Sequence, residues 1–284
     1  MYTHNYIQFF CTVGLLSILC SCTGNGEGNG GDGDADSTAL DSLENLEPEL
    51  QLYEEAVIPQ SVDELFDDFF FNFISDPRFQ SQRMYLPLRG IGESASHSIS
   101  KQEWNETSVF GSQDFYCSFF DKEADIEFMK DTTLTAVSVE WLHTDEDYVM
   151  AYNFQRREGH WVLSDYERKA LSSTPHADFA QFYHQFVTDT TFQRQAIQQP
   201  LPLVTLDAGE ESAGGTMELS ADDWFEFSKE MPLPSTTMTN INYGQPNTSE
   251  THRILLVSSI GSSLFVKYKF ERINGEWRLK GIEN

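Results

Sequence analysis

Residues 66–82 read FDDFFFNFISDPRFQSQ, and residues 179–195 read FAQFYHQFVTDTTFQRQ. The two stretches align without a gap at an offset of 113, and seven of their seventeen positions are identical. Chance at ordinary residue frequencies would give about one identity. The first stretch places Phe66, Phe69, Phe70, Phe73 and Ile74 on one helical stripe, and the second stretch repeats the stripe. The sequence therefore predicts a duplicated unit that opens with an amphipathic helix.

The residues around these two helices also correspond. Ser61 and Glu64 have the spacing of a capping box before the first helix, and Pro175 is predicted at the first helical position in the second repeat. Asp76 and its counterpart Asp189 are predicted to cap a second, short helix. In each repeat an LPL sequence and a Trp in a short acidic helix follow; these tryptophans, Trp104 and Trp224, are expected to be core residues.

The later part of each repeat has the pattern of β-strands. Apolar and polar residues alternate in TLTAVSVEWL and YVMAYNFQR of the first repeat, and in RILLVSSI and SLFVKYKFER of the second. The repeats close on similar phrases, FQRREGHWVL at 154–163 and FERINGEWRL at 270–279. Asn274-Gly275 is a strong hairpin signal, and Gly159 repeats its glycine. Each repeat is thus predicted to end in a hairpin anchored by Trp161 or Trp277.

Helices followed by a meander predict an α+β fold with two tandem cone-like domains, each a helical hairpin packed on a curved antiparallel sheet. We assign residues 61–170 to the first repeat and residues 171–284 to the second, which we call the first and second halves. This element order resembles the nuclear-transport-factor-two-like, or cystatin-like, fold. The chain resembles uncharacterised lipoproteins of gut anaerobes with tandem domains of this fold, a family of unknown function.

The N-terminus has the pattern of an export signal. Residues 7–19 form an apolar run too short to span a bilayer. The run ends in LCSC, which resembles a bacterial lipoprotein signal with Cys22 as the lipidated residue; Cys20 is the rival. We therefore expect a signal peptide at 1–21 and a lipidated, acidic, Gly-rich tether at 22–60. The predicted location is extracytoplasmic, on the outer membrane through the N-terminal lipid, on the periplasmic side or at the cell surface. A plain secretory signal is the alternative.

Charge and residue spacing exclude several classes of function. The net charge is −27, with 18 Lys and Arg against 45 Asp and Glu, so a nucleic-acid partner is not expected. The histidines have no zinc-site spacing, and DGDADS at 32–37 lacks the Gly and the bidentate Glu of a calcium loop. Cys117, within the aromatic run FYCSFF, is expected to be buried in the core. We predict no metal and no cofactor.

No catalytic residues are predicted, because no hydrolase, metalloprotease or phosphate-loop motif is present. Trp141 with His143, and Tyr85 with Arg89, share strand faces by their spacing and are candidates to line a cone cavity, although packing or solvent exposure also explains them. These features favour a non-enzymatic binding or interaction module, with a small-molecule, peptide or glycan ligand. Two alternatives remain: an enzyme that uses one cone cavity, and a structural pseudo-dimer without a ligand.

Overall fold

The two predicted opening helices are present. The computed structural model describes residues 62–107, 109–110, 115–206, 215–231, 233–259 and 265–284. The predicted signal peptide and tether, with Cys22, and Ser61 of the predicted capping box lie outside these residues. Helix α1 spans Phe66–Ser75 and helix α4 spans Ala177–Thr188. The predicted starts were wrong, since Leu65 and His176 occupy the N-cap positions and neither caps through its side chain. Burial of the aromatic stripe stabilises each helix instead.

The predicted short helices and their caps are confirmed. Helix α2 spans Pro77–Gln82, and the Asp76 side chain accepts a hydrogen bond of 2.8 Å from the backbone N–H of Arg78. Helix α5 spans Thr190–Gln195, and Asp189 caps it in the same way. The acidic Trp segments form α3 (Lys101–Thr107) and α6 (Ala221–Phe227). The tryptophans of both segments are buried.

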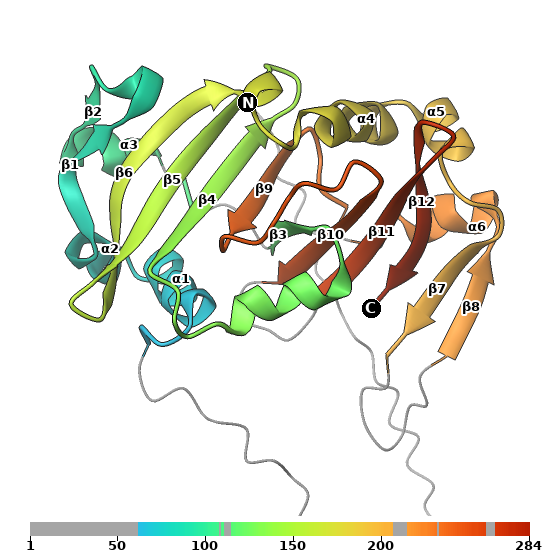
Figure 1. The fold of residues 1–284 in the computed structure, drawn as a ribbon, viewed down its shortest axis with the longest axis horizontal. Helices are drawn as coiled ribbons and strands as arrows, with labels where there is room; N and C mark the ends of the chain where they lie inside the picture. The colour runs from blue at the N-terminus through green and yellow to red at the C-terminus, as the bar shows by residue number, and fades with distance from the viewer. Residues whose placement is uncertain (1–61, 108, 111–114, 207–214, 232, 260–264) are drawn as a thin grey trace, which may run out of the picture. The chain divides into compact units, whose positions relative to one another are not determined.

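Twelve strands of the described residues form two six-stranded sheets. Sheet A has the order β2 (Ser98–Ile99), β1 (Met84–Gly90), β6 (His160–Ala170), β5 (Tyr148–Arg157), β4 (Ala136–His143) and β9 (Thr237–Asn242). Sheet B has the order β3 (Phe115–Phe120), β10 (His252–Ser259), β11 (Phe265–Ile273), β12 (Glu276–Glu283), β7 (Leu201–Thr205) and β8 (Gly215–Leu219). The pairs β1–β6 and β12–β7 are parallel, and the other pairs are antiparallel. Figure 1 shows the curvature of both sheets, and the α+β class with two cone-like domains is confirmed.

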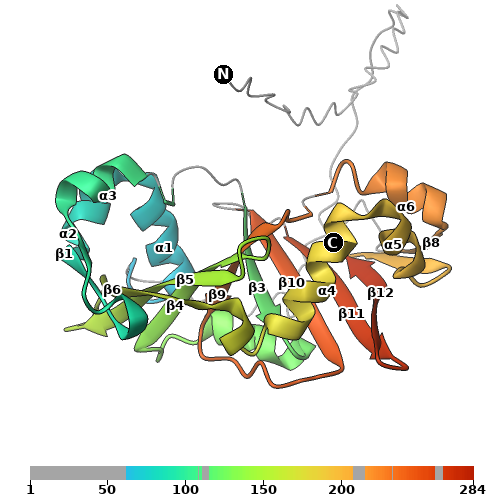
Figure 2. The ribbon, with the colours of Figure 1, turned by 90° about the horizontal axis from the view of Figure 1, so that it is seen from above.

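The two halves exchange equivalent strands. β9 belongs to the second half but pairs with β4 of sheet A, and β3 belongs to the first half but pairs with β10 of sheet B. Each sheet therefore takes five strands from one half and its last strand from the other. Figure 2 shows β9 and β3 side by side between β4 and β10. The boundary between residues 170 and 171 stays a prediction, because the strand order does not test where one domain ends.

Side chains of β9 and of Gln245, which follows it, satisfy the free backbone edge of β3. The backbone N–H of Cys117 donates to Thr239 Oγ1 at 2.8 Å, and that of Phe119 donates to Asn240 Oδ1 at 2.9 Å. The Gln245 amide donates to the Phe119 carbonyl at 3.0 Å. Buried backbone groups need such partners, so these side chains join the two sheets where no strand ladder does.

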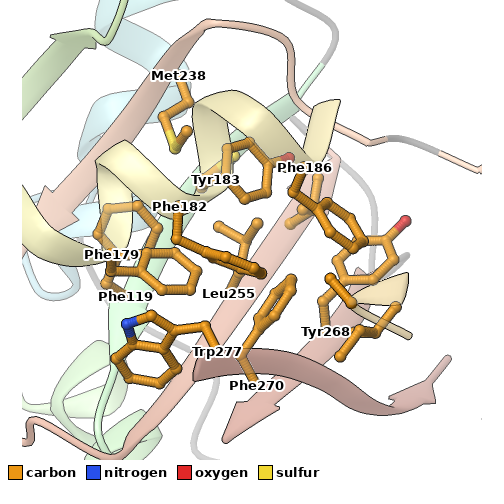
Figure 3. Close-up of a cluster of buried hydrophobic side chains, with 14 of the residues drawn as sticks. Phe119, Phe179, Phe182, Tyr183, Phe186, Met238, Leu255, Tyr268, Phe270 and Trp277 are labelled. Atoms are coloured by element: carbon orange, nitrogen blue, oxygen red, sulfur yellow. The ribbon is translucent and has the colours of Figure 1, made fainter. Parts of the chain in front are cut away.

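Aromatic side chains fill two hydrophobic cores. In the first core, the ring centroids of Phe66 and Trp161 are 5.1 Å apart. In the second core, the equivalent Phe179 and Trp277 are 5.4 Å apart. Figure 3 shows how Phe179, Phe182 and Phe186 of α4 gather with Trp277 and Phe270 in the second core. Buried aromatic side chains contribute large apolar areas, and here they occupy the space between helix and sheet in each half.

The repeated closing phrase forms the same turn twice. Glu158 and Gly159 have φ values of 50° and 85°, and Asn274 and Gly275 have values of 54° and 86°. Two successive residues of positive φ match a type I′ hairpin turn, which favours glycine. The predicted hairpins are thus confirmed. Arg156 lies over the ring of Trp161, and Arg272 lies over that of Trp277.

Candidate functional site

An open groove of about 870 Å³ lies at the rim of the first half, where α2 leads into β1 beside the tip of the β5–β6 hairpin. Its lining residues are Gln82, Arg83, Tyr85, Arg156, Arg157, Glu158, His160 and Val162. The lining thus contains three arginines and a histidine but one glutamate, in a chain whose acidic residues outnumber its basic ones. The groove is therefore a local exception to the acidic charge of the protein.

Asp63 fixes two of the basic side chains that line the groove. The buried carboxylate accepts two hydrogen bonds from Arg83, of 2.8 and 3.0 Å, and lies 2.8 Å from His160 Nδ1. It also accepts the backbone N–H of Trp161 at 2.9 Å. Burial alone would raise the pKa of Asp63, but the hydrogen bonds from Arg83, His160 and Trp161 outweigh it and lower this pKa. A charged Asp63 therefore orients Arg83 and His160 before any ligand arrives.

The groups that line the groove differ in how far they are available to a ligand. Arg156 donates to the carbonyls of Thr132 and Asp63, so it holds the hairpin against the turn before α1. Arg157 is exposed and has a side-chain contact with Gln155. The His160 side chain is 63% exposed and Tyr85 is 53% exposed. Arg157, His160 and Tyr85 are thus the groups best placed to meet a ligand.

The second half lacks most of these groups, because of the three arginines only Arg156 has a basic counterpart, Arg272. At the repeat offsets, Ala196 stands in place of Arg83, Ile273 in place of Arg157 and Glu276 in place of His160. The aromatic core positions are the same in the two halves, as described above. The groove chemistry is therefore specific to the first half and is not a by-product of the repeated fold.

The structure separates the four residues that the sequence suggested as cavity lining. Tyr85 lines the groove. Arg89 is exposed on the same strand, and Trp141 is 8% exposed within the first core. His143 stacks on Tyr148 with a centroid distance of 4.3 Å. Tyr85 is the one of the four that lines this groove.

The turn after β4 holds a group that could bind a metal ion. His143, Asp145 and Glu146 place potential ligand atoms within 4.8 Å of one another. Desolvation lowers the pKa of His143, although Glu146 and Asp145 partly oppose this effect. Both carboxylates are exposed, as acidic turn residues often are. The exposure of these carboxylates is that of a solvated acidic turn beside the stacked His143.

Sequence analysis missed a buried polar cluster between the halves. Glu140 lies 2.8 Å from the amide nitrogen of Asn240 and 3.5 Å from His176 Nε2, and Lys169 lies 3.3 Å away. Burial would raise the pKa of Glu140, but His176, Lys169 and Asn240 lower it. His176 stands at the repeat position of Asp63. That difference in charge between aligned positions is the signal that could have revealed both clusters.

Two further ionisable groups lie against the cores. Cys117 is buried as predicted, and burial raises its pKa to about 12, which makes it a poor nucleophile. Burial raises the pKa of Asp67 to about 6, although the hydroxyl of Tyr243 donates to it at 2.6 Å and partly opposes the shift. Asp67 thus connects α1 to the segment after β9 and does not line the groove.

Comparisons with known proteins identify the family. A family model described as a domain of unknown function (DUF4348) matches residues 46–284. An NTF2-like protein from Bacteroides fragilis with a known crystal structure is 36% identical to this chain in sequence. The two structures match with a TM-score of 0.70, and the match covers 80% of this chain and 98% of that chain. A comparison with curated proteins finds no match. Within the described residues, no helix has the length and apolar character needed to cross a membrane. The chain belongs to the DUF4348 family.

Proposed function

We propose that the protein is a non-enzymatic binding module that contacts its ligand at the groove of the first half. The observation that carries the proposal is the set of basic side chains oriented by Asp63 on a rim that the second half does not reproduce. Concave sites with a few fixed polar groups are typical of ligand binding. The NTF2-like fold is compatible with such a role.

A thermal-shift screen of the full chain with polysaccharides, peptides, lipids and small molecules tests the proposal. We expect at least one class to raise the melting temperature. Tyr85→Ala should weaken binding of that hit about tenfold, as expected when about 1.4 kcal/mol of contact energy is lost. Phe71→Ala is the matched control, because Phe71 is a 41% exposed aromatic residue outside the groove. A screen without hits, or hits that Tyr85→Ala leaves unchanged, would contradict the proposal.

The proposed location is the cell envelope, with a lipid on Cys22 as the anchor. The support is the LCSC sequence after an apolar run and the acidic stretch that follows it. In cells fed an alkyne fatty acid, the full chain should acquire the label and sediment with membranes. Cys22→Ser should lose both properties, whereas Cys20→Ser should keep them. Equal labelling of the Cys22→Ser protein would rule out this residue as the anchor.

The alternatives have less support. An enzyme in a cone cavity needs open space, and aromatic side chains occupy the interior of both described cores. The pseudo-dimer alternative gains support from the exchanged strands. Its exclusion of a ligand has no such support, since the second half can stabilise the first half while the first half binds a ligand.

A further inference from the structure

We propose that the groove of the first half binds an acidic saccharide, a sugar chain with carboxylate groups. This inference rests on the proposed function and adds the class of ligand. Three observations support it: the charge of the groove, the oriented donors and the exposed tyrosine.

The charges of the groove favour an anion. Asp63 and Glu158 offset two of the three arginines, which leaves one net positive charge before His160 is counted. Elsewhere the chain is strongly acidic, so an anion attracted to this face is repelled by most other faces. An anionic ligand should therefore bind at the groove and not at the other, acidic faces of the protein.

The available donors suit a carboxylate. Arg157 is exposed, and its planar guanidinium can donate two parallel hydrogen bonds to a carboxylate. His160 Nδ1 faces Asp63 at 2.8 Å, so the Nε2 atom is the ring nitrogen left for a ligand. With Nδ1–H donating to Asp63, Nε2 accepts from a hydroxyl group in the neutral ring and donates to a carboxylate in the imidazolium. Because a buried carboxylate holds this ring, less conformational entropy is lost on binding.

The remaining lining favours a sugar over an acidic peptide. Tyr85 offers a half-exposed ring that the C–H face of a sugar can cover, and Gln82 offers an amide for hydroxyl groups. Val162 is the one aliphatic side chain among the lining residues. Peptides are recognised through apolar pockets for their side chains or, when they are acidic, through clusters of arginines. This groove has little apolar lining, and Arg83 and Arg156 are already held by Asp63 and by backbone carbonyls.

Calorimetry on the full chain tests the inference with uronate oligosaccharides, the galacturonate, glucuronate and alginate series, each beside its carboxyl-methyl ester. We expect at least one free acid to bind ten times more tightly than its ester, and Arg157→Ala to remove most of that difference. Arg78→Ala is the control, since Arg78 is an exposed arginine of α2 outside the groove lining. Raising the NaCl concentration from 50 to 500 mM should weaken binding of the free acid, and the loss should be larger for the wild type than for Arg157→Ala.

The outcomes separate this inference from the proposed function. Equal binding of acid and ester that depends on Tyr85 would overturn the acidic class and leave a binding groove. Preference for glutamate-rich peptides over every uronate would also overturn it, with a peptide as the ligand. If no uronate binds, the acidic-saccharide inference fails; if the broader screen also finds no ligand at the groove, the proposed function fails with it.

Discussion

Residues 61–170 expressed alone are expected not to form a folded monomer, and the same is expected of residues 171–284. The reason is that each half lacks the last strand of its own sheet. Without β9, the edge of β4 loses the partners that face Ser138 to His143. Without β3, the edge of β10 loses its ladder from Ile254 to Ser259. Unpaired edges of this length favour aggregation or pairing with another chain.

Each half also contributes side chains to the core of the other half. The first core includes four buried side chains from the second half: Ile241, Tyr243, Ile254 and Leu256. The second core includes four from the first half: Cys117, Phe119, Leu142 and Val149. Burial of one large apolar side chain contributes about 1.5–3 kcal/mol, so four approach the whole stability of a domain, about 5–15 kcal/mol. Either half alone should therefore be unfolded, or should recover a partner by exchange with a second copy.

Size-exclusion chromatography and amide NMR dispersion measure this outcome. Co-expression of the two halves is the control, and it should yield a soluble one-to-one complex with the spectrum of the intact chain. An isolated half that is monomeric and well dispersed would show that the strand exchange is dispensable. It would also support a domain boundary between residues 170 and 171.

Asp63→Ala is expected to lower the free energy of unfolding by about 3 kcal/mol at pH 7, in the range measured for breaking a buried ion pair. The side chains of Asp63 and Arg83 are 5% and 17% exposed, so removal of the carboxylate leaves a largely buried guanidinium without its partner. The backbone N–H of Trp161 loses its acceptor as well. Urea denaturation at pH 7 measures the loss.

The effect should depend on pH in one direction. Because the folded protein lowers the pKa of Asp63 below its ordinary value of 3.8, the stabilisation is fully present above that value. It is lost as the pH falls through the folded-state pKa, so wild type and variant should converge in strong acid. Asp178→Ala is the control: Asp178 contacts Arg272 and Trp277 but is 64% exposed, and the expected loss is at most about 1 kcal/mol. Equal losses for the two variants would contradict the role of Asp63.

The predictable part of the fold is the part with local periodicity. The Phe stripes identified α1 and α4, and the glycines identified both closing hairpins. The exchanged strands were not predicted as strands because neither alternates. FYCSFF of β3 sends side chains into both cores, and the polar residues of β9 are buried because Thr239 and Asn240 bond to β3. The choice of strand partner also depends on contacts between residues about a hundred or more positions apart, which no local pattern encodes.

The candidate site was even less accessible from sequence. Asp63 and His160 are separated by 97 positions, and no motif joins them. Tyr85 was suggested for its strand face, which is exposed in the structure. Trp141 packs in the first core, which agrees with the packing alternative to a cavity-lining role. Charge differences between aligned repeat positions point to the clusters around Asp63 and Glu140. The two repeats share residues at positions buried in the cores, and they differ at positions that are exposed to solvent or lie between the repeats.

Strand β3 constrains how this protein can evolve. It contributes Tyr116 and Phe120 to the first core, and Cys117 and Phe119 to the second. Because side chains alternate along a strand, deletion of one residue here would turn both sets to the wrong side at once. Compensating substitutions would then have to arise in both repeats together. Loss or replacement of one repeat is therefore expected to disrupt the other, and we expect the pair to be inherited as one unit.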